Sequence, residues 1–118
     1  MNILVVGTGT IGEPLIGLFT KFSGELGISE VIFLKRTPLK HERAKVNSLL
    51  RRGAKLACYV ETIESFNSLG HKVSYHFREA LEKADFIIDC TPAGNINKRL
   101  VYDDFAREYP EKVFIAQG

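Results

Sequence analysis

The chain opens with Ile3-Leu4-Val5-Val6, which runs directly into Gly7-Thr8-Gly9-Thr10-Ile11-Gly12. Four consecutive apolar residues are typical of a strand buried on both faces of a parallel sheet, and the three glycines have the G-x-G-x-x-G spacing. In such a turn Gly7 makes the tight bend, Gly9 lets the backbone approach a pyrophosphate, and Gly12 lets the next helix sit close to the strand. That helix offers unpaired N–H groups and a partial positive charge to the phosphates. The stretch predicts a dinucleotide-binding site.

The residues after the turn predict an amphipathic helix. One apolar stripe at i, i+4, i+7, i+8 and i+11 comprises Ile11, Leu15, Leu18, Phe19 and Phe22. Pro14 falls in the first turn, where its missing N–H would have no partner. A tight turn without a ligand is the alternative, but the strand–turn–helix context favours the binding turn.

Strand-like and helix-like segments alternate along the rest of the chain. We expect strands at 31–34, 56–60, 72–77, 86–90 and 113–116, and helices at 39–52, 63–69, 78–83 and 96–108. In the edge strand 72–77, Val73, Tyr75 and Phe77 should share one face, and 113–116 should be buried. The series predicts a single domain, residues 1–118, with a doubly wound, mostly parallel Rossmann-type sheet and helices on both faces.

Composition agrees with an ordinary soluble domain. Of the 118 residues, 45% are hydrophobic and 25% are charged, as in typical globular proteins. Cys58 and Cys90 form no disulfide or zinc pattern, and we expect a protein of the reducing cytoplasm. Neither a signal peptide nor an apolar run of membrane-spanning length is evident, so no membrane partner is expected.

Charge indicates which dinucleotide is bound. NAD sites place a carboxylate about 20 residues beyond the glycines to bind the ribose 2′-OH, but here the second strand ends in Lys35-Arg36-Thr37 without an acid. The segment from Lys35 to Lys55 has eight basic residues and one acid, a net charge of +7, whereas the whole chain carries +2. We therefore expect Lys35, Arg36 and Thr37 to bind a 2′-phosphate, which favours NADP over NAD.

The basic segment has two other interpretations. A solvated helix face accounts for Lys45, Arg51 and Arg52. A nucleic-acid patch would also cluster Lys and Arg. The pI of about 8.6 is modest, however, and no helix-turn-helix, RNP or zinc signature accompanies the patch, so no nucleic-acid partner is expected.

Several short motifs occur together in an informative order. They are Gly7-Thr8-Gly9-Thr10-Ile11-Gly12, Lys35-Arg36-Thr37-Pro38, Arg43-Ala44-Lys45, Leu81-Glu82-Lys83-Ala84-Asp85, Asp89-Cys90-Thr91-Pro92-Ala93-Gly94, Asn97-Lys98 and Gln117-Gly118. In this order and rough spacing the chain resembles the N-terminal NAD(P)-binding domain of archaeal-type (type II) glyceraldehyde-3-phosphate dehydrogenases. The acid-x-Thr-Pro segment followed by Asn-Lys, and the closing Gln-Gly, narrow the resemblance to this family.

The resemblance implies roles for individual residues. Thr10 and Ile11 match the pair whose backbone meets the cofactor phosphates, and Lys35 matches a lysine beside the adenosine 2′-phosphate. Thr91 and Pro92 match residues beside the ribose and nicotinamide, and Gly118 matches a glycine at the mouth of the active site.

The resemblance also implies an activity for the complete protein. Family members accept NADP, and often NAD as well, and are associated with glycolysis. They oxidise and phosphorylate an aldehyde through a cysteine thioester. That cysteine lies beyond Gly118, so the catalytic domain is expected to be absent and these 118 residues alone inactive. We expect a monomer or weak dimer for this chain, and a homotetramer for the complete family protein.

Other functions stay open at the level of sequence. One is a stand-alone dinucleotide sensor or regulatory module, and another is the cofactor domain of a semialdehyde or homoserine-type dehydrogenase, because fold does not fix the reaction. No catalytic or metal-ligating residues are predicted. Cys90 is expected to be a buried apolar residue with a raised pKa rather than a nucleophile. Asp89 is expected to be a structural carboxylate held by backbone N–H groups and Thr91, with contact to the cofactor ribose as the alternative. The three histidines His41, His71 and His76 are expected to lie on the solvated surface.

Overall fold

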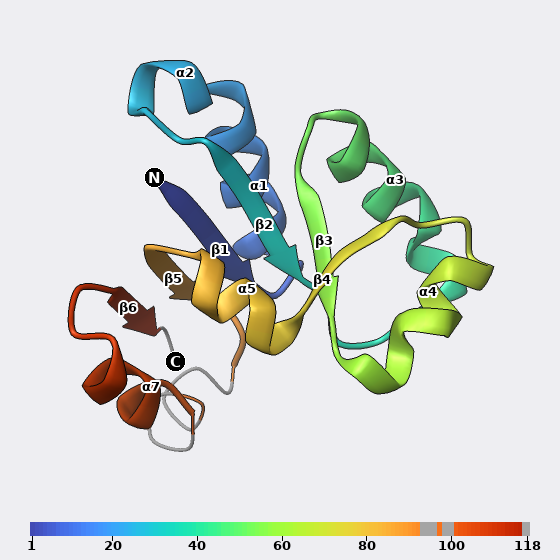
Figure 1. The fold of residues 1–118 in the computed structure, drawn as a ribbon. Helices are drawn as coiled ribbons and strands as arrows, with labels where there is room; N and C mark the ends of the chain where they lie inside the picture. The colour runs from blue at the N-terminus through green and yellow to red at the C-terminus, as the bar shows by residue number, and fades with distance from the viewer. Residues whose placement is uncertain (93–96, 98–100, 117–118) are drawn as a thin grey trace.

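A six-stranded, all-parallel sheet forms the centre of the molecule (Figure 1). The computed structural model describes residues 1–92, 97 and 101–116. The strand order is β4-β3-β2-β1-β5-β6. The strands are β1 (Asn2–Val6), β2 (Glu30–Leu34), β3 (Lys55–Cys58), β4 (Val73–His76), β5 (Phe86–Asp89) and β6 (Val113–Ala116). The predicted α/β fold of Rossmann type is confirmed.

Helices pack on both faces of the sheet. The α-helices are α1 (Gly12–Lys21), α2 (Ser23–Leu26), α3 (Arg43–Arg51), α4 (Ile63–Ser68), α5 (Phe77–Lys83) and α7 (Asp103–Glu108); the short 3-10 helices are η1 (Lys40–Glu42) and η2 (Val60–Thr62). One core contains α1, α3 and α4 with strand residues such as Val5 and Phe33. The other contains α5 and α7 with strand residues such as Leu4 and Ile32. Figure 1 shows α1 and α5 on opposite sides of the sheet. The alternation of strand residues between two cores explains the continuous apolar runs.

The buried face of α1 differs from the predicted stripe. Ile16 is fully buried and Phe19 packs against the core, whereas Ile11 and Leu18 are exposed. Gly12 sets this orientation, because a Cβ there would lie 2.1 Å from the carbonyl oxygen of Gly7. The helix therefore turns Gly12 and the residues four and seven positions later toward the sheet.

Two strand predictions are also corrected. The register between β3 and β4 shifts so that Leu56 pairs with Val73 but Ala57 pairs with Tyr75. This irregularity places Val73 in one core and Tyr75 in the other, instead of on a shared face. At the opposite edge, β6 is half-exposed rather than buried: Phe114 packs against the core that contains α7, whereas Val113 and Ile115 are exposed.

Several element boundaries differ modestly from the predictions. The helix expected at 39–52 begins with η1, and α3 ends at Arg51. The strand expected at 56–60 ends at Cys58, and η2 begins two residues later at Val60. Of the helix expected at 96–108, α7 covers 103–108, and the segments 93–96 and 98–100 lie outside the described residues.

The strand order reverses at β1, and this fixes where a ligand can bind. From β1 the chain adds β2, β3 and β4 on one side, then β5 and β6 on the other. Val6, at the end of β1, is level with Leu34 of β2 and Asp89 of β5. Ligands of open α/β sheets bind outside the carboxyl ends of the strands at this switch point.

Candidate functional site

The turn after β1 has the backbone geometry that its glycines predict. Gly7 has a φ of +104°, and a Cβ there would lie 3.0 Å from the methyl group of Thr91. Gly12 brings α1 against the turn, because a Cβ added at this position would clash with the carbonyl group of Gly7. A Cβ on Gly9 would meet no atom within 4 Å. Gly7 and Gly12 are thus required by the fold, whereas Gly9 faces open space.

Unpaired backbone donors line the same turn. Within the described part of the chain, the N–H groups of Gly9, Thr10 and Ile11 have no backbone acceptor, whereas the Glu13 N–H donates to the Gly9 carbonyl at 3.1 Å. These donors lie at the N-terminus of the ten-residue helix α1. Free N–H groups combined with the helix dipole favour an anion.

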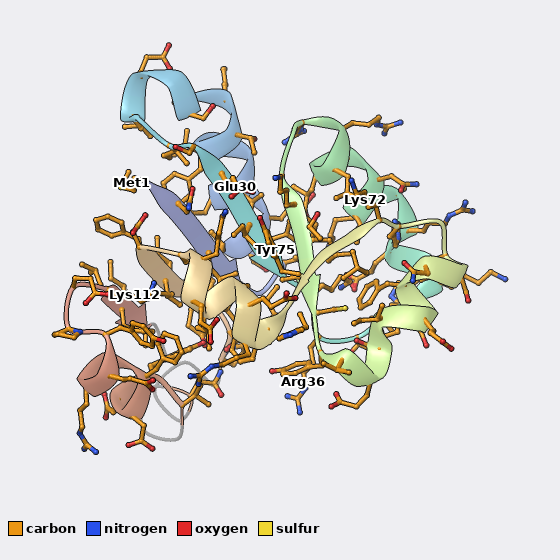
Figure 2. All side chains as sticks on the ribbon, in the orientation of Figure 1. Met1, Glu30, Arg36, Lys72, Tyr75 and Lys112 are labelled. Atoms are coloured by element: carbon orange, nitrogen blue, oxygen red, sulfur yellow. The ribbon has the colours of Figure 1, made fainter. Side chains whose placement is uncertain are left out.

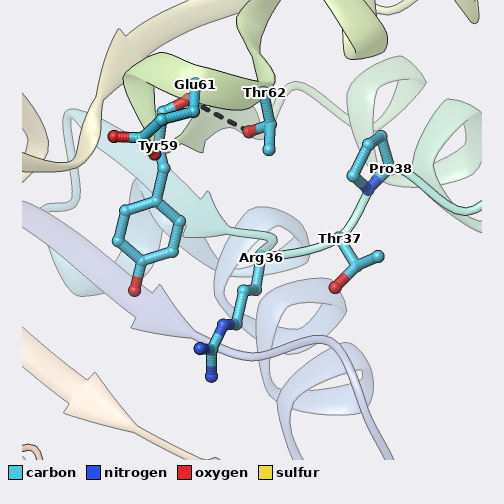
Figure 3. Close-up of a pocket in the computed structure, with 6 residues that line it drawn as sticks. All are labelled: Arg36, Thr37, Pro38, Tyr59, Glu61 and Thr62. Carbon is cyan, nitrogen blue, oxygen red and sulfur yellow. Dashed lines mark hydrogen bonds between the residues drawn. The ribbon is translucent and has the colours of Figure 1, made fainter.

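Two neighbouring pockets open along the carboxyl ends of the strands. The first, of about 220 Å³, lies at the switch point, and its lining residues include Gly7, Arg36, Tyr59, Thr91 and Pro92. The second, of about 460 Å³, is lined by Arg36, Thr37, Pro38, Tyr59, Glu61 and Thr62 (Figure 3). Because both pockets share Arg36 and Tyr59, they form one groove across the ends of β5, β1, β2 and β3.

A buried carboxylate fixes the wall of the groove after β5. Asp89 is fully buried and accepts hydrogen bonds from the Thr91 N–H at 2.8 Å and the Thr91 hydroxyl at 2.5 Å. It also accepts from Asn97 Nδ2 at 2.8 Å and from the Tyr102 hydroxyl at 2.6 Å. Burial and then the hydrogen bond to Asp89 raise the pKa of Tyr102. Asp89 thus has the predicted structural role, and it orients Thr91.

The wall after β2 contains a charged network. Lys35 is only 7% exposed; its Nζ lies 2.7 Å from Glu42 and donates to the Thr8 hydroxyl at 3.4 Å. Lys45 donates to the other oxygen of Glu42 at 2.9 Å and to the Thr8 carbonyl at 3.0 Å, and lies 3.8 Å from Glu13. Hydrogen bonds from Lys35 and then Lys45 lower the pKa of Glu42 to about 2. The network joins η1 and α3 to the glycine turn.

Arg36 differs from its lysine neighbour. Its side chain is exposed and has no ion pair or hydrogen bond among the described residues. In Figure 3 the guanidinium extends from the end of β2 in the same direction as the ring of Tyr59. Arg36 is therefore a cation that is free to meet an anionic ligand in the groove.

The structure brings most of the predicted site residues to one edge of the sheet. These are Gly7, Thr8, Gly9, Thr10, Ile11, Gly12, Lys35, Arg36, Thr37, Thr91 and Pro92. Gly118 lies outside the described residues. Tyr59 and Glu42 were not predicted as site residues, and Asn97 was noted only as part of the Asn97-Lys98 motif. The position of Tyr59 near the carboxyl end of the strand expected at 56–60 was the available signal, whereas Glu42 lies seven residues beyond Lys35 and gave none.

Among the other titratable residues, the expectation for the Cys90 thiol is confirmed and that for His71 is wrong. Cys90 is partly buried, and burial and then the charge of Asp89 raise the pKa of its thiol, as expected. The expectation of a surface position is wrong for His71, which is 2% exposed. His71 lies in the segment between α4 and β4, and its ring centroid is 6.3 Å from that of Phe66. His76 caps α5, accepting from the Glu79 N–H at 3.3 Å.

Comparison with known proteins supports a dehydrogenase relationship. Over 93 residues, 79% of its length, the chain is 30% identical to glyceraldehyde-3-phosphate dehydrogenase 2 of Methanosarcina barkeri. It is 32% identical to glyceraldehyde-3-phosphate dehydrogenase 1 of Methanosarcina acetivorans, also over 79% of its length. The matches cover 25% and 26% of those proteins, so the chain spans about a quarter of the length of the curated relatives it matches. No family model matches the chain.

The fold and these relatives together define a class of protein. The chain is a Rossmann-type domain similar to part of the glyceraldehyde-3-phosphate dehydrogenases. Among the described residues, no three or more His, Cys, Asp and Glu side chains are grouped to hold a metal ion. None of the described helices is long and apolar enough to cross a membrane.

Proposed function

We propose that this chain is the N-terminal NAD(P)-binding domain of a phosphorylating, archaeal-type glyceraldehyde-3-phosphate dehydrogenase, with NADP preferred. The proposal rests above all on the groove at the switch point, where the glycine turn, Arg36 and Thr91 lie together. Relatives with that enzyme name over 79% of the chain support the same reaction class. A cytoplasmic location and a homotetrameric complete protein belong to the proposal.

The residues present fit a dinucleotide. Gly9 leaves open space beside three free N–H donors, which suits a pyrophosphate at the start of α1. Tyr59 offers an aromatic side wall, and Thr91 and Pro92 line the groove on the β5 side. When bound, a nicotinamide cofactor accepts or donates hydride. The residues described here bind and orient it.

The cations after β2 support NADP over NAD. Lys35 and Lys45 pair with the carboxylates of Glu42 and Glu13, whereas Arg36 lies outside this network and lines the groove. Arg36 is unpaired among the described residues, and its guanidinium can bind a phosphate with two hydrogen bonds. We therefore expect the attraction between Arg36 and an additional 2′-phosphate to favour NADP at this wall.

Thermal unfolding with each reduced cofactor tests the proposal. A ligand at 100 times its dissociation constant stabilises a protein by about 2.7 kcal/mol, which raises the melting temperature of a small domain by about 10 °C. At equal concentrations NADPH should raise it more than NADH. In Arg36→Ser the two shifts should become similar, because the exposed guanidinium is removed without disturbing a contact. Equal shifts in the wild-type protein would contradict the NADP preference, and no shift with either cofactor would contradict the proposed function.

A further inference from the structure

Two glutamates flank β2 in matching arrangements. At the amino end, Glu30 lies 2.5 Å from Lys55 and 3.4 Å from Lys83. At the carboxyl end, Glu42 lies 2.7 Å from Lys35 and 2.9 Å from Lys45. Both carboxylates are mostly buried and each bridges two lysines. Only the Glu42 bridge adjoins the glycine turn; Figure 2 shows Glu30 and Arg36 at opposite ends of the strand.

The Glu42 bridge occupies the cations that the sequence assigns to a phosphate. The Lys35 ammonium is almost inaccessible, and burying such a charge is costly unless an anion pairs with it. Glu42 supplies that anion within the chain itself. Because Lys35 and Lys45 both also donate to Thr8 of the glycine turn, the whole network lies directly beside the expected cofactor phosphates.

We propose that Glu42 is a specificity-determining residue, an internal counter-charge that opposes a 2′-phosphate and so limits the preference for NADP. The inference rests on the proposed function, since it concerns the same groove. A 2′-phosphate must either displace Glu42 from the two lysines or bind beside an ionised carboxylate. Either route reduces the gain from the extra phosphate. NADH carries only a 2′-hydroxyl, so Glu42 imposes no comparable cost on it.

The arrangement also limits the positive charge that the basic segment presents to a cofactor. The segment from Lys35 to Lys55 carries +7, yet two of its lysines share the carboxylate of Glu42 and a third, Lys55, pairs with Glu30. Close to the turn, the two ammonium groups of Lys35 and Lys45 face the two carboxylates of Glu42 and Glu13, so their charges are balanced there. Arg36 remains as the exposed cation of this wall among the described residues, and Glu42 determines how much Lys35 and Lys45 add to it.

Calorimetric titration of NADPH and NADH into Glu42→Gln tests the inference. The substitution removes the negative charge and preserves the shape of the side chain. We expect the dissociation constant for NADPH to fall about tenfold or more, a change of about 1.4 kcal/mol, and that for NADH to change less than about threefold. Glu30→Gln is the matched control, because it breaks an equivalent two-lysine bridge at the far end of β2. It should leave both dissociation constants unchanged.

The outcomes separate the inference from the proposed function. An unchanged ratio of the two dissociation constants in Glu42→Gln overturns the inference, as does weaker NADPH binding, which would mean that the carboxylate positions the lysines for the phosphate. Failure of both cofactors to bind the wild-type chain and both variants overturns the proposed function instead. If Glu42→Gln does not fold, Glu42→Asp keeps the charge but shortens its reach to the two lysines. It should tighten NADPH binding to a smaller extent, and an unchanged ratio there also overturns the inference.

Discussion

His71 is a buried titratable residue whose environment favours the neutral ring. Neither ring nitrogen has a hydrogen-bond partner among the described residues. Burial, then the positive charges of Arg43 and Lys35, lowers the pKa of His71 below its usual value of 6.5. Protonation of the folded state is therefore unfavourable.

This lowered pKa predicts a specific loss of stability in mild acid. Between pH 6.5 and the lower pKa of the folded state, the unfolded chain binds a proton at His71 and the folded chain does not. The stabilisation is complete above about pH 6.5 and falls as the pH is lowered, by at most about 1.4 kcal/mol per pH unit for one group. Urea unfolding measured at pH 7.5, 6.5 and 5.5 should show this decline.

Two variants identify the responsible side chain. His71→Leu removes the titration and two unpaired nitrogens at similar volume, so we expect a flatter pH profile over this range and no loss of stability at pH 7.5. His41→Gln, at an exposed position, should retain the decline. The same slope in wild type and His71→Leu would exclude His71 as its source.

At the scale of elements, two glycines of the turn between β1 and α1 have different roles, one in stability and one in binding. Gly12→Ala would place a methyl group against the Gly7 carbonyl oxygen and push α1 away from the sheet. We expect it to cost about 3 kcal/mol of unfolding free energy, at the upper end of overpacking effects. Gly9→Ala meets no atom within 4 Å and should leave stability nearly unchanged while weakening binding of either cofactor.

Urea unfolding and calorimetric titration of both glycine variants give the comparison. Stability should fall only in Gly12→Ala, whereas Gly9→Ala should lose affinity with a wild-type unfolding midpoint. Wild-type affinity of Gly9→Ala for both cofactors would show that the open side of the turn is not where the pyrophosphate binds.

The order of elements could be predicted because local signals and the fold agree. The apolar run of β1, the glycine turn and the glycines with positive φ at 53 and 70 each specify one structure. The residues after the strand ends could likewise be placed at one edge, because parallel strands bring those ends together.

Predictions from the sequence failed where contacts between residues far apart in the chain determine the local structure. The helical period of α1 fits two stripes one residue apart, and the Gly12–Gly7 contact selects between them. The irregular pairing of β3 with β4 has no local signature. Glu42 reaches Lys35 only because η1 turns the chain back toward β2, and Tyr102 bonds to Asp89, which lies 13 residues earlier in the sequence. Such tertiary pairs are not encoded in residue spacing.

The whole molecule covers its sheet unevenly. Right-handed crossovers place α1, α3 and α4 over one face as the chain moves from β1 toward β4, and α5 and α7 over the other face as it approaches β5 and β6. No described helix therefore packs on the α1 face of β6. There, Val113 and Ile115 are level with Phe86 and Ile88 of β5 and are 41% and 52% exposed.

This apolar surface predicts concentration-dependent association of the isolated chain. It continues into a hollow of about 230 Å³ lined by Met1, Ile3, Phe19, Leu26, Ile28, Phe86 and Ile88. Contiguous exposed apolar area favours burial against another surface, and a second copy is the partner present in a pure sample. Sedimentation velocity over a wide range of protein concentrations should show a weak dimer. Ile115→Lys should shift the protein toward monomer, because a charge at the centre of the patch opposes its burial.

The matched control is Val60→Lys, which places the same charge at an apolar residue that is 63% exposed in η2, away from this face. It should leave the association unchanged, and both substitutions should alter the unfolding free energy by less than about 0.5 kcal/mol, as is usual for surface positions. Equal weakening by the two variants would trace the association to net charge. A wild-type chain that stays monomeric at every concentration would show that this face does not pair with itself, even though it exposes two β-branched side chains beside an apolar hollow.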